Sequence, residues 1–139
     1  MLISTKGRYA LRVMVDLAEQ DPERFVRLQE IADRQGISEK YLEGIVVKLS
    51  RAGDLVSARG KGGGYRLSRA PEKYTADEIV CLAEGTLAPV TCMKDGESCE
   101  RAGQCPTRPM WEGLDRVITE YLSRWTVADL LKNAQEMQP

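Results

Sequence analysis

Three of the four cysteines in this 139-residue chain lie close together, as Cys92, Cys99 and Cys105. Six and five residues separate the neighbouring cysteines, a wider spacing than in the two-residue pairs of zinc ribbons. Thiolates are soft ligands, and a loop containing glycine can wrap around the bulk of an iron–sulfur cluster. We therefore expect these cysteines to bind an iron–sulfur cluster, of the 2Fe-2S or the 4Fe-4S type. A structural zinc ion and unligated thiols are the alternatives.

The remaining reactive side chains narrow the class of protein. The chain contains no histidine, which excludes Ser–His and Cys–His nucleophilic pairs and imidazole metal ligands, so we do not expect an enzyme. Cys81 shares a predicted helix with Ile79 and Leu82, which favours a core cysteine over a ligand. No apolar run approaches the roughly 20 residues of a membrane span. We expect a cytoplasmic protein whose thiols stay reduced.

A second group of residues is basic and rich in glycine. Residues 57–69 contain four Lys or Arg side chains and no acidic residue. Residues 1–70 hold 13 Lys and Arg against 9 Asp and Glu, a net charge of +4, whereas 71–139 hold 7 against 12, a net charge of -5. This local positive charge indicates a polyanion partner, and double-stranded DNA is the natural one. The alternative is a solvated edge hairpin whose charges prevent aggregation.

The elements that position these groups can be predicted from hydrophobic periodicity and capping residues. The first half predicts three helices and then two strands, over residues 5–19, 28–35, 39–52, 55–58 and 65–68. Gly36 separates the second helix from the third, and Ser38 caps the third. A short helix, a turn and a longer helix form a helix-turn-helix, and the glycine-rich hairpin beside it would be its wing.

The second half predicts a further helix from Thr75 to Gly85 and a long irregular loop over 86–108. A long helix from Pro109 and a final turn before a frayed tail complete the chain. One face of the long helix carries Trp111, Leu114, Ile118, Tyr121, Leu122 and Trp125. So large an apolar surface predicts a homodimer.

These elements predict a mainly α fold with a small β-hairpin wing, in which a winged helix-turn-helix precedes a long dimerisation helix. We expect four segments along the chain. They are a DNA-binding domain over 1–70, a linker and short helix over 71–85, a cluster-binding loop over 86–108, and a dimerisation helix and tail over 109–139.

In a winged helix-turn-helix the second helix of the pair lies in the major groove, and a basic hairpin reaches the neighbouring minor groove. This arrangement predicts DNA contacts from Ser38, Lys40, Tyr41, Glu43, Lys48, Arg59 and Lys61. Glu43 would accept a hydrogen bond from cytosine, Lys40 and Lys48 would reach phosphates or guanine, and Arg59 would meet the negative potential of the minor groove. Core packing of Tyr41 and a solvated helix face for Glu43 are the alternatives.

Four motifs together resemble the IscR and NsrR family of bacterial winged-helix transcription regulators. They are Ser-Thr-Lys-Gly-Arg-Tyr-Ala at 4–10, Gln-Gly-Ile-Ser-Glu-Lys-Tyr-Leu-Glu at 35–43, Arg-Gly-Lys-Gly-Gly-Gly-Tyr at 59–65, and the three-cysteine loop before Trp111. The resemblance covers nearly the whole chain. It implies a homodimer built on the long helix, a partly palindromic operator in double-stranded DNA, and an iron–sulfur cluster on the three cysteines in sensing members.

The chain departs from the family pattern at the fourth cluster ligand. IscR-like members place a histidine three residues after the third cysteine, where this chain has Arg108. Some nitric-oxide-sensing members use an acidic residue from the partner's first helix, where this chain has Arg8. A small thiol, water or one of four side chains would have to complete the site: Asp95, Glu97, Glu100 or Thr107. Members that resemble CymR lack the three cysteines.

We therefore expect a DNA-binding transcription repressor whose cluster senses redox state, nitric oxide or cluster supply. One alternative keeps the DNA-binding dimer but gives the loop a structural zinc or no metal, with regulation by a protein partner. A more distant alternative is a redox electron carrier, against which the basic hairpin argues because an electron carrier needs no groove-reading ribbon.

Overall fold

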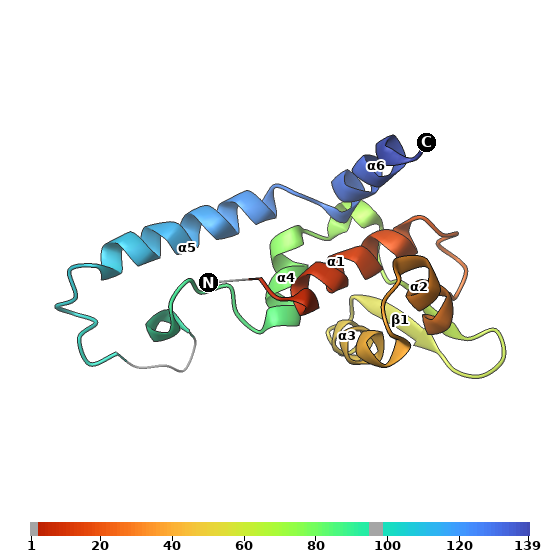
Figure 1. The fold of residues 1–139 in the computed structure, drawn as a ribbon, viewed down its shortest axis with the longest axis horizontal. Helices are drawn as coiled ribbons and strands as arrows, with labels where there is room; N and C mark the ends of the chain where they lie inside the picture. Colours follow the sequence, from red (N-terminus) through yellow and green to blue (C-terminus); the bar gives the residue numbers. More distant parts are fainter. Residues whose placement is uncertain (1–2, 95–98) are drawn as a thin grey trace.

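The computed structural model describes residues 3–94 and 99–139, and it shows the predicted mainly α fold with a β-hairpin wing (Figure 1). The elements of the described residues, in chain order, are α1 (Thr5–Ala18), α2 (Leu28–Gln35), α3 (Glu39–Arg51), β1 (Leu55–Ala58), β2 (Gly64–Leu67), η1 (Pro71–Lys73), α4 (Ala76–Glu84), η2 (Thr91–Met93), α5 (Arg108–Ser123) and α6 (Val127–Met137). No helix in this part of the chain is long and apolar enough to cross a bilayer.

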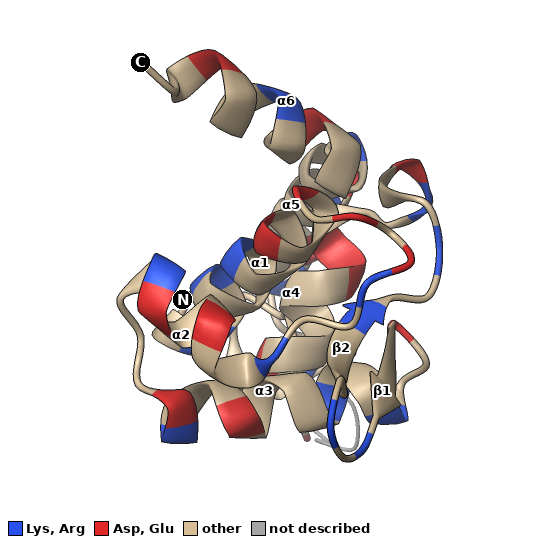
Figure 2. Ribbon diagram, turned by 90° about the vertical axis from the view of Figure 1, so that its right-hand side faces the viewer, with Lys and Arg blue, Asp and Glu red and all other residues tan. Residues whose placement is uncertain are grey.

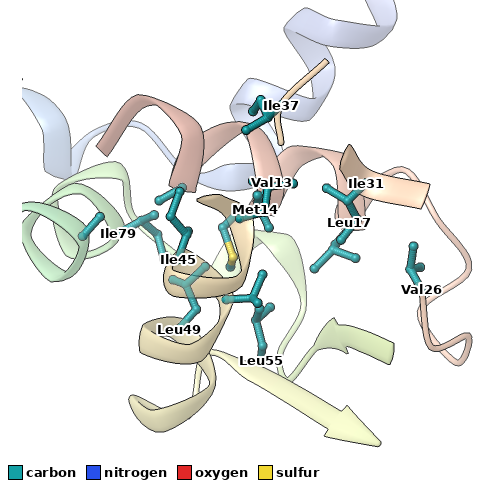
Figure 3. Packing of buried hydrophobic residues seen from close by; sticks show 14 of the residues in the cluster. Val13, Met14, Leu17, Val26, Ile31, Ile37, Ile45, Leu49, Leu55 and Ile79 are labelled. Carbon is teal, nitrogen blue, oxygen red and sulfur yellow. The ribbon is translucent and has the colours of Figure 1, made fainter. Parts of the chain in front are cut away.

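Helix α1 is the centre of the core. Its cap residue, Ser4, accepts a hydrogen bond from the Lys6 amide at 3.1 Å. Its apolar residues recur with the helical period and therefore face the core on one side of the helix. Four of these residues are buried: Ala10, Val13, Met14 and Leu17. Side chains from α2, α3, β1 and α4 meet them (Figure 3). Because α1 also packs on α6 and β2, it joins the first and last thirds of the chain.

A buried carboxylate fixes α2 against α1. Asp16 of α1 is only 2% exposed, and its two oxygens accept hydrogen bonds from the Arg34 guanidinium at 3.0 and 2.8 Å. The Gln35 amide donates a third bond at 2.8 Å. A buried charge is tolerated when it is paired and its lone pairs are filled, and three bonds from α2 achieve this.

The predicted helix-turn-helix is confirmed. Gly36 ends α2 in the left-handed conformation, at φ 65°, and its amide bonds back to the Ala32 carbonyl. Ser38 then caps α3 by accepting from the Tyr41 amide at 3.1 Å. The short turn therefore sets the angle between α2 and α3 through a glycine conformation and a serine cap, as the sequence predicted.

The hairpin pairs β1 with β2 in antiparallel register, from Leu55 opposite Leu67 to Ala58 opposite Gly64. The hairpin is also joined to the segment before α2, because Tyr65 of β2 exchanges two backbone hydrogen bonds of 2.8 Å with Val26. At Gly64, which has φ 141°, any side chain would collide with the Val26 carbonyl. The sequence predicted the three consecutive glycines at 62–64 as turn residues. Gly64 is instead needed because the backbone of Val26 lies too close to leave room for a side chain.

The last two helices differ from the prediction in detail. The expected final turn is a full helix, α6, which Thr126 caps and Val127 anchors in the core. The face predicted on α5 is split, because Trp111, Ile118, Leu122 and Trp125 are half-buried while other apolar residues of α5 are exposed. The exposed ones are Met110, Leu114, Val117 and Tyr121. The reason is that α5 packs mainly on α4, which covers only one side of it.

Replacing Asp16 tests the buried carboxylate. Asp16→Ala leaves the donors of Arg34 and Gln35 without their acceptor and opens a small void. We expect it to lower the free energy of unfolding by about 2–4 kcal/mol, measured by urea denaturation. Asp33→Ala, which removes an exposed carboxylate from α2, is the control and should change it by less than about 0.5 kcal/mol. Equal effects of the two substitutions would contradict the role given to Asp16.

Candidate DNA interface and cysteine loop

The structure exposes all seven residues predicted to contact DNA. They lie on α3 and on the turn between β1 and β2, at one end of the molecule (Figures 1 and 2). Three of the seven also make contacts within the protein: Ser38 caps α3, the Tyr41 hydroxyl lies beside Thr5, and the Lys48 ammonium donates to the Ala83 carbonyl at 3.4 Å. Among the described residues no ion pair involves Lys40, Lys48, Arg59 or Lys61. Their charges therefore face solvent and are available to a polyanion.

Tyr41 is neither a core residue nor a loose surface group. It is 37% exposed, so the alternative of core packing is wrong. Its hydroxyl lies 2.6 Å from Thr5 Oγ1, and its ring meets the Tyr9 ring edge-on at a centroid distance of 5.7 Å. These contacts with α1 hold the first turn of α3 at a fixed position.

The start of α1 is in turn held by Glu84, the last residue of α4. One oxygen of Glu84 accepts from the Ser4 amide at 2.8 Å, the Ser4 hydroxyl at 2.7 Å and the Gly7 amide at 3.0 Å. Partial burial raises the pKa of Glu84, but the hydrogen bonds from Ser4 and Gly7 outweigh it and the pKa is lowered overall. A side chain at Gly7 would meet this oxygen at 2.9 Å. Glu84 gave no recognisable signal in the sequence beyond its place before Gly85.

The wing has its own anchor, Tyr74, which the sequence analysis did not single out. Its buried hydroxyl donates to the Asp54 carbonyl at 2.7 Å and accepts from the Ser68 and Arg69 amides, each at 3.0 Å. The Arg69 guanidinium lies 4.2 Å above the Tyr74 ring and 3.1 Å from the Asp54 carboxylate. The base of the hairpin is thereby fixed on both strands.

The four basic residues of the hairpin divide into two pairs. Arg69 supports the hairpin base, and Arg66 stacks on Phe25 at 4.4 Å with its guanidinium 3.5 Å from Glu23. Arg59 and Lys61 stand at the exposed turn, where Lys and Arg gather (Figure 2). The turn residues are therefore the hairpin's candidate DNA contacts, as the sequence predicted.

The three loop cysteines are free thiols, each partly buried. Cys92 lies in η2, Cys99 precedes a turn, and Cys105 lies just before α5. In residues 3–94 and 99–139 no three His, Cys, Asp or Glu side chains are grouped to bind a metal. A hydrogen bond with Thr107 Oγ1, at 3.2 Å, lowers the pKa of Cys105 and so favours the thiolate. The donor chemistry fits a soft metal centre, although these side chains are not gathered into a site.

Cys81, Arg108 and the candidates for the fourth ligand have different surroundings. Cys81 is exposed, so its prediction as a core cysteine is wrong: Ile79, Val80 and Ala83 face the core, and Cys81 lies on the outer side of α4. Arg108 pairs with Glu112 at 2.9 Å. Of the four candidate fourth ligands, Glu100 is exposed and Thr107 bonds Cys105, whereas Asp95 and Glu97 lie outside the described residues.

Comparison with known proteins places this geometry in a family. Residues 3–133 match the model of Rrf2, described as an iron-dependent transcriptional regulator. The chain belongs to the Rrf2 family. This Rrf2-family chain is 36% identical to the protein rrf2 of Nitratidesulfovibrio vulgaris, over 96% of this chain and 89% of that protein. It is 40% identical to the transcriptional regulator IscR of Cereibacter sphaeroides, over 100% of this chain and 91% of that protein.

Solved structures agree with this assignment. The global cysteine regulator CymR of B. subtilis matches with a TM-score of 0.77 and 37% identity, over 96% of this chain and 98% of that one. IscR of T. potens matches with a TM-score of 0.78 and 35% identity, over 100% and 92%. The protein is therefore a winged-helix, DNA-binding transcription regulator, and its relatives are regulators rather than enzymes, as expected.

Arg59 provides a test of the hairpin turn. Arg59→Ala should weaken binding to duplex DNA and reduce the slope of log K against log salt by about 0.9, because one phosphate neutralisation is lost. The melting temperature should not change, since Arg59 is exposed. Lys132→Ala on α6, at the other end of the molecule, is the matched control and should leave the slope unaltered. An unchanged slope for Arg59→Ala would remove the turn from the interface.

Proposed function

We propose that the protein is a dimeric repressor that binds a partly palindromic operator and senses a signal at an iron–sulfur cluster. Helix α3 would enter the major groove with Ser38, Lys40, Tyr41, Glu43 and Lys48, and the hairpin turn would reach the minor groove with Arg59 and Lys61. The observation that carries the proposal is that α3 and the hairpin present these exposed residues at one end of the molecule. Tyr41 fixes α3 on α1, and Tyr74 fixes the base of the hairpin. Such a protein would act on the chromosome in the cytoplasm.

The division of labour along the chain is part of the proposal. Residues 1–70 would bind DNA, 86–108 would hold the cluster and 109–139 would make the dimer. The segment 71–85 would be more than a linker. Its Ala76 amide bonds to the Trp125 carbonyl at 2.8 Å, while Tyr74 and Glu84 anchor the wing and α1.

The exposed side of α5 supports the homodimer. Met110, Leu114, Val117 and Tyr121 are 57%, 40%, 62% and 55% exposed. Their spacing of four, three and four residues is that of a coiled-coil seam, so they form one stripe along α5. Four large apolar side chains in a row favour burial against a second copy. The stripe differs from the face predicted from the sequence, which included the half-buried Ile118.

A charge in the stripe tests the dimer. Val117→Glu should give a species of 15.5 kDa in sedimentation, where the wild type should show twice that mass at micromolar concentration. Burying an unpaired carboxylate in the seam opposes association. Thr119→Glu is the matched control, because the 3.6-residue period places it on the other side of α5, and it should remain dimeric. A monomeric wild type would contradict the proposed dimer.

We assign the cluster to Cys92, Cys99 and Cys105. Support comes from three free, partly buried thiols in one loop and from the lowered pKa of Cys105, since the thiolate is the ligating form. When bound, the cluster would supply a centre that reacts with oxygen or nitric oxide. The cluster type and the fourth ligand stay open, and a weak fourth ligand would make the site labile.

The chain provides a physical connection from this loop to the DNA-reading helix. The loop follows Gly85 directly, Glu84 holds the start of α1, and Thr5 of α1 contacts Tyr41 of α3. A change in the order of the loop would act along these contacts. It would also act through α5, by shifting the spacing of the two recognition helices. Operator half-sites lie roughly 34 Å apart, so small shifts alter affinity.

A second candidate function has a specific observation in its favour. The likeness to CymR, a global cysteine regulator, favours a regulator without a cluster. The second candidate is therefore the same DNA-binding dimer with a structural zinc or no metal in the loop, regulated by a protein partner. The family match favours either kind of regulator over an electron carrier.

Metal analysis separates the two candidates. Anaerobically purified protein should contain iron and acid-labile sulfide, be brown and bleach in air. Alanine at Cys92, Cys99 or Cys105 should abolish the colour, whereas Cys81→Ala, which removes an exposed thiol on α4, should retain it. The affinity of the coloured protein for a duplex selected from a random pool should change at least about tenfold, or 1.4 kcal/mol, with nitric oxide or oxygen. Identical responses from the triple variant and the wild type would leave only the second candidate.

A further inference from the structure

A cavity of about 340 Å³ lies between α1, α3 and α4, and none of the residues that line it belongs to the cysteine loop. Its apolar lining comes from α3 and α4: Tyr41, Ile45, Leu49, Leu82 and Ala83. Ile45, Leu49 and Ala83 are at most 6% exposed, so Tyr41 and Leu82 present the larger part of the apolar surface. Ile45 and Leu49 are core residues, so this part of the lining is the outer surface of the core (Figure 3). The volume is at the lower end of the range of small-molecule sites, which is about 300–1,000 Å³.

The cavity is open because α3 carries a glycine in its interior. Gly44 is not among the glycines with positive φ, so the backbone does not require it. A Cβ built at Gly44 would meet no atom within 4 Å, so packing within the chain does not require it either. A mid-helix glycine weakens a helix relative to alanine. The lack of a side chain at Gly44 therefore leaves open a cavity that no other part of the chain fills.

Three lysines line the cavity beside this apolar surface. Lys6 comes from α1, Lys40 and Lys48 come from α3, and no acidic residue is among the described residues that line the cavity. Lys48 reaches across to the Ala83 carbonyl at 3.4 Å, which places its charge at the junction of α3 and α4. Charge of one sign around an apolar surface favours an anion that also has an apolar part. A DNA phosphate satisfies the lysines but leaves the apolar lining uncovered.

We propose that this cavity binds a small organic carboxylate with an apolar body of about eight carbon atoms. The carboxylate pairs with the lysines, and the hydrocarbon covers the apolar lining. Because Lys40 and Lys48 are also proposed DNA contacts, the bound ligand opposes DNA docking. This second effect rests on the proposed function, whereas binding of the carboxylate does not.

Octanoate is a suitable probe. Its binding is monitored through the amide chemical shifts of ¹⁵N-labelled wild-type protein in the absence of DNA. We expect saturable shifts centred on Gly44, Leu82 and Ala83, with a Kd on the order of 10⁻⁴ to 10⁻³ M for a ligand of this size. Acetate lacks the hydrocarbon and 1-octanol lacks the charge, so each should bind at least about tenfold more weakly. No saturable shifts, or equal binding of octanoate and 1-octanol, would overturn the proposal.

Gly44 offers a matched pair of variants. Gly44→Leu fills the cavity from a position where the helix accepts a side chain, and it should abolish octanoate binding without lowering the melting temperature. Gly44→Ala adds one methyl group and should bind octanoate within about threefold of the wild type, because most of the cavity remains. Octanoate binding that survives Gly44→Leu would place the ligand elsewhere and overturn the site.

The effect on DNA is measured separately, as the ratio of duplex affinities with and without saturating octanoate. Octanoate should lower the affinity of the wild type for duplex DNA at least about fivefold. For Gly44→Leu the ratio of the two affinities should be near one. Octanoate binding with no loss of DNA affinity would overturn the competition but keep the site. Failure of the wild type to bind duplex DNA at all would contradict the proposed function, while the shift titration would still decide the cavity.

Discussion

The carboxylate of Asp16 lies inside the protein, and its demand for partners determines how the DNA-reading half is arranged. Arg34 and Gln35 supply those partners from the last turn of α2, so a shift of α2 along α1 would leave the buried charge without them. Arg12 of α1 adds hydrogen bonds to the side chain and carbonyl of Gln35. Since α3 follows after a short turn, the orientation of α3 depends on the same interaction.

The opposite end of α1 carries a second carboxylate with a different consequence. Glu84 fills the unpaired amides at the start of α1, where the helix dipole favours negative charge. Helix α1 is thus held at both ends, by α2 near its C-terminus and by α4 at its N-terminus. Helices α2, α3, α4 and α6 and strand β2 all pack against this one helix (Figure 1). In the proposed mechanism, this central helix would connect a change in the loop to α3.

Charge alone did not separate structural from functional residues in the wing. All four basic hairpin residues contributed to the prediction of a DNA contact, yet Arg66 and Arg69 are used to hold the hairpin on Phe25, Tyr74 and Asp54. The base of the hairpin is fixed by packing, whereas its turn is exposed to solvent. If Arg59 and Lys61 contact DNA as proposed, the fixed base would reduce the conformational entropy that the hairpin loses on binding.

The sequence by itself determined most features whose signal is local. The cap at Ser38, glycines at 36 and 85, and the helical period predicted the order and most boundaries of the helices and the hairpin, although α6 was expected only as a final turn. The candidate DNA contacts followed from the same motifs. Tertiary structure decided the exposure of Cys81, the split face of α5, the close contact at Gly64 and the anchors Tyr74 and Glu84. These depend on which distant segment packs against a residue, and a periodic pattern says only that a face is apolar, not what covers it.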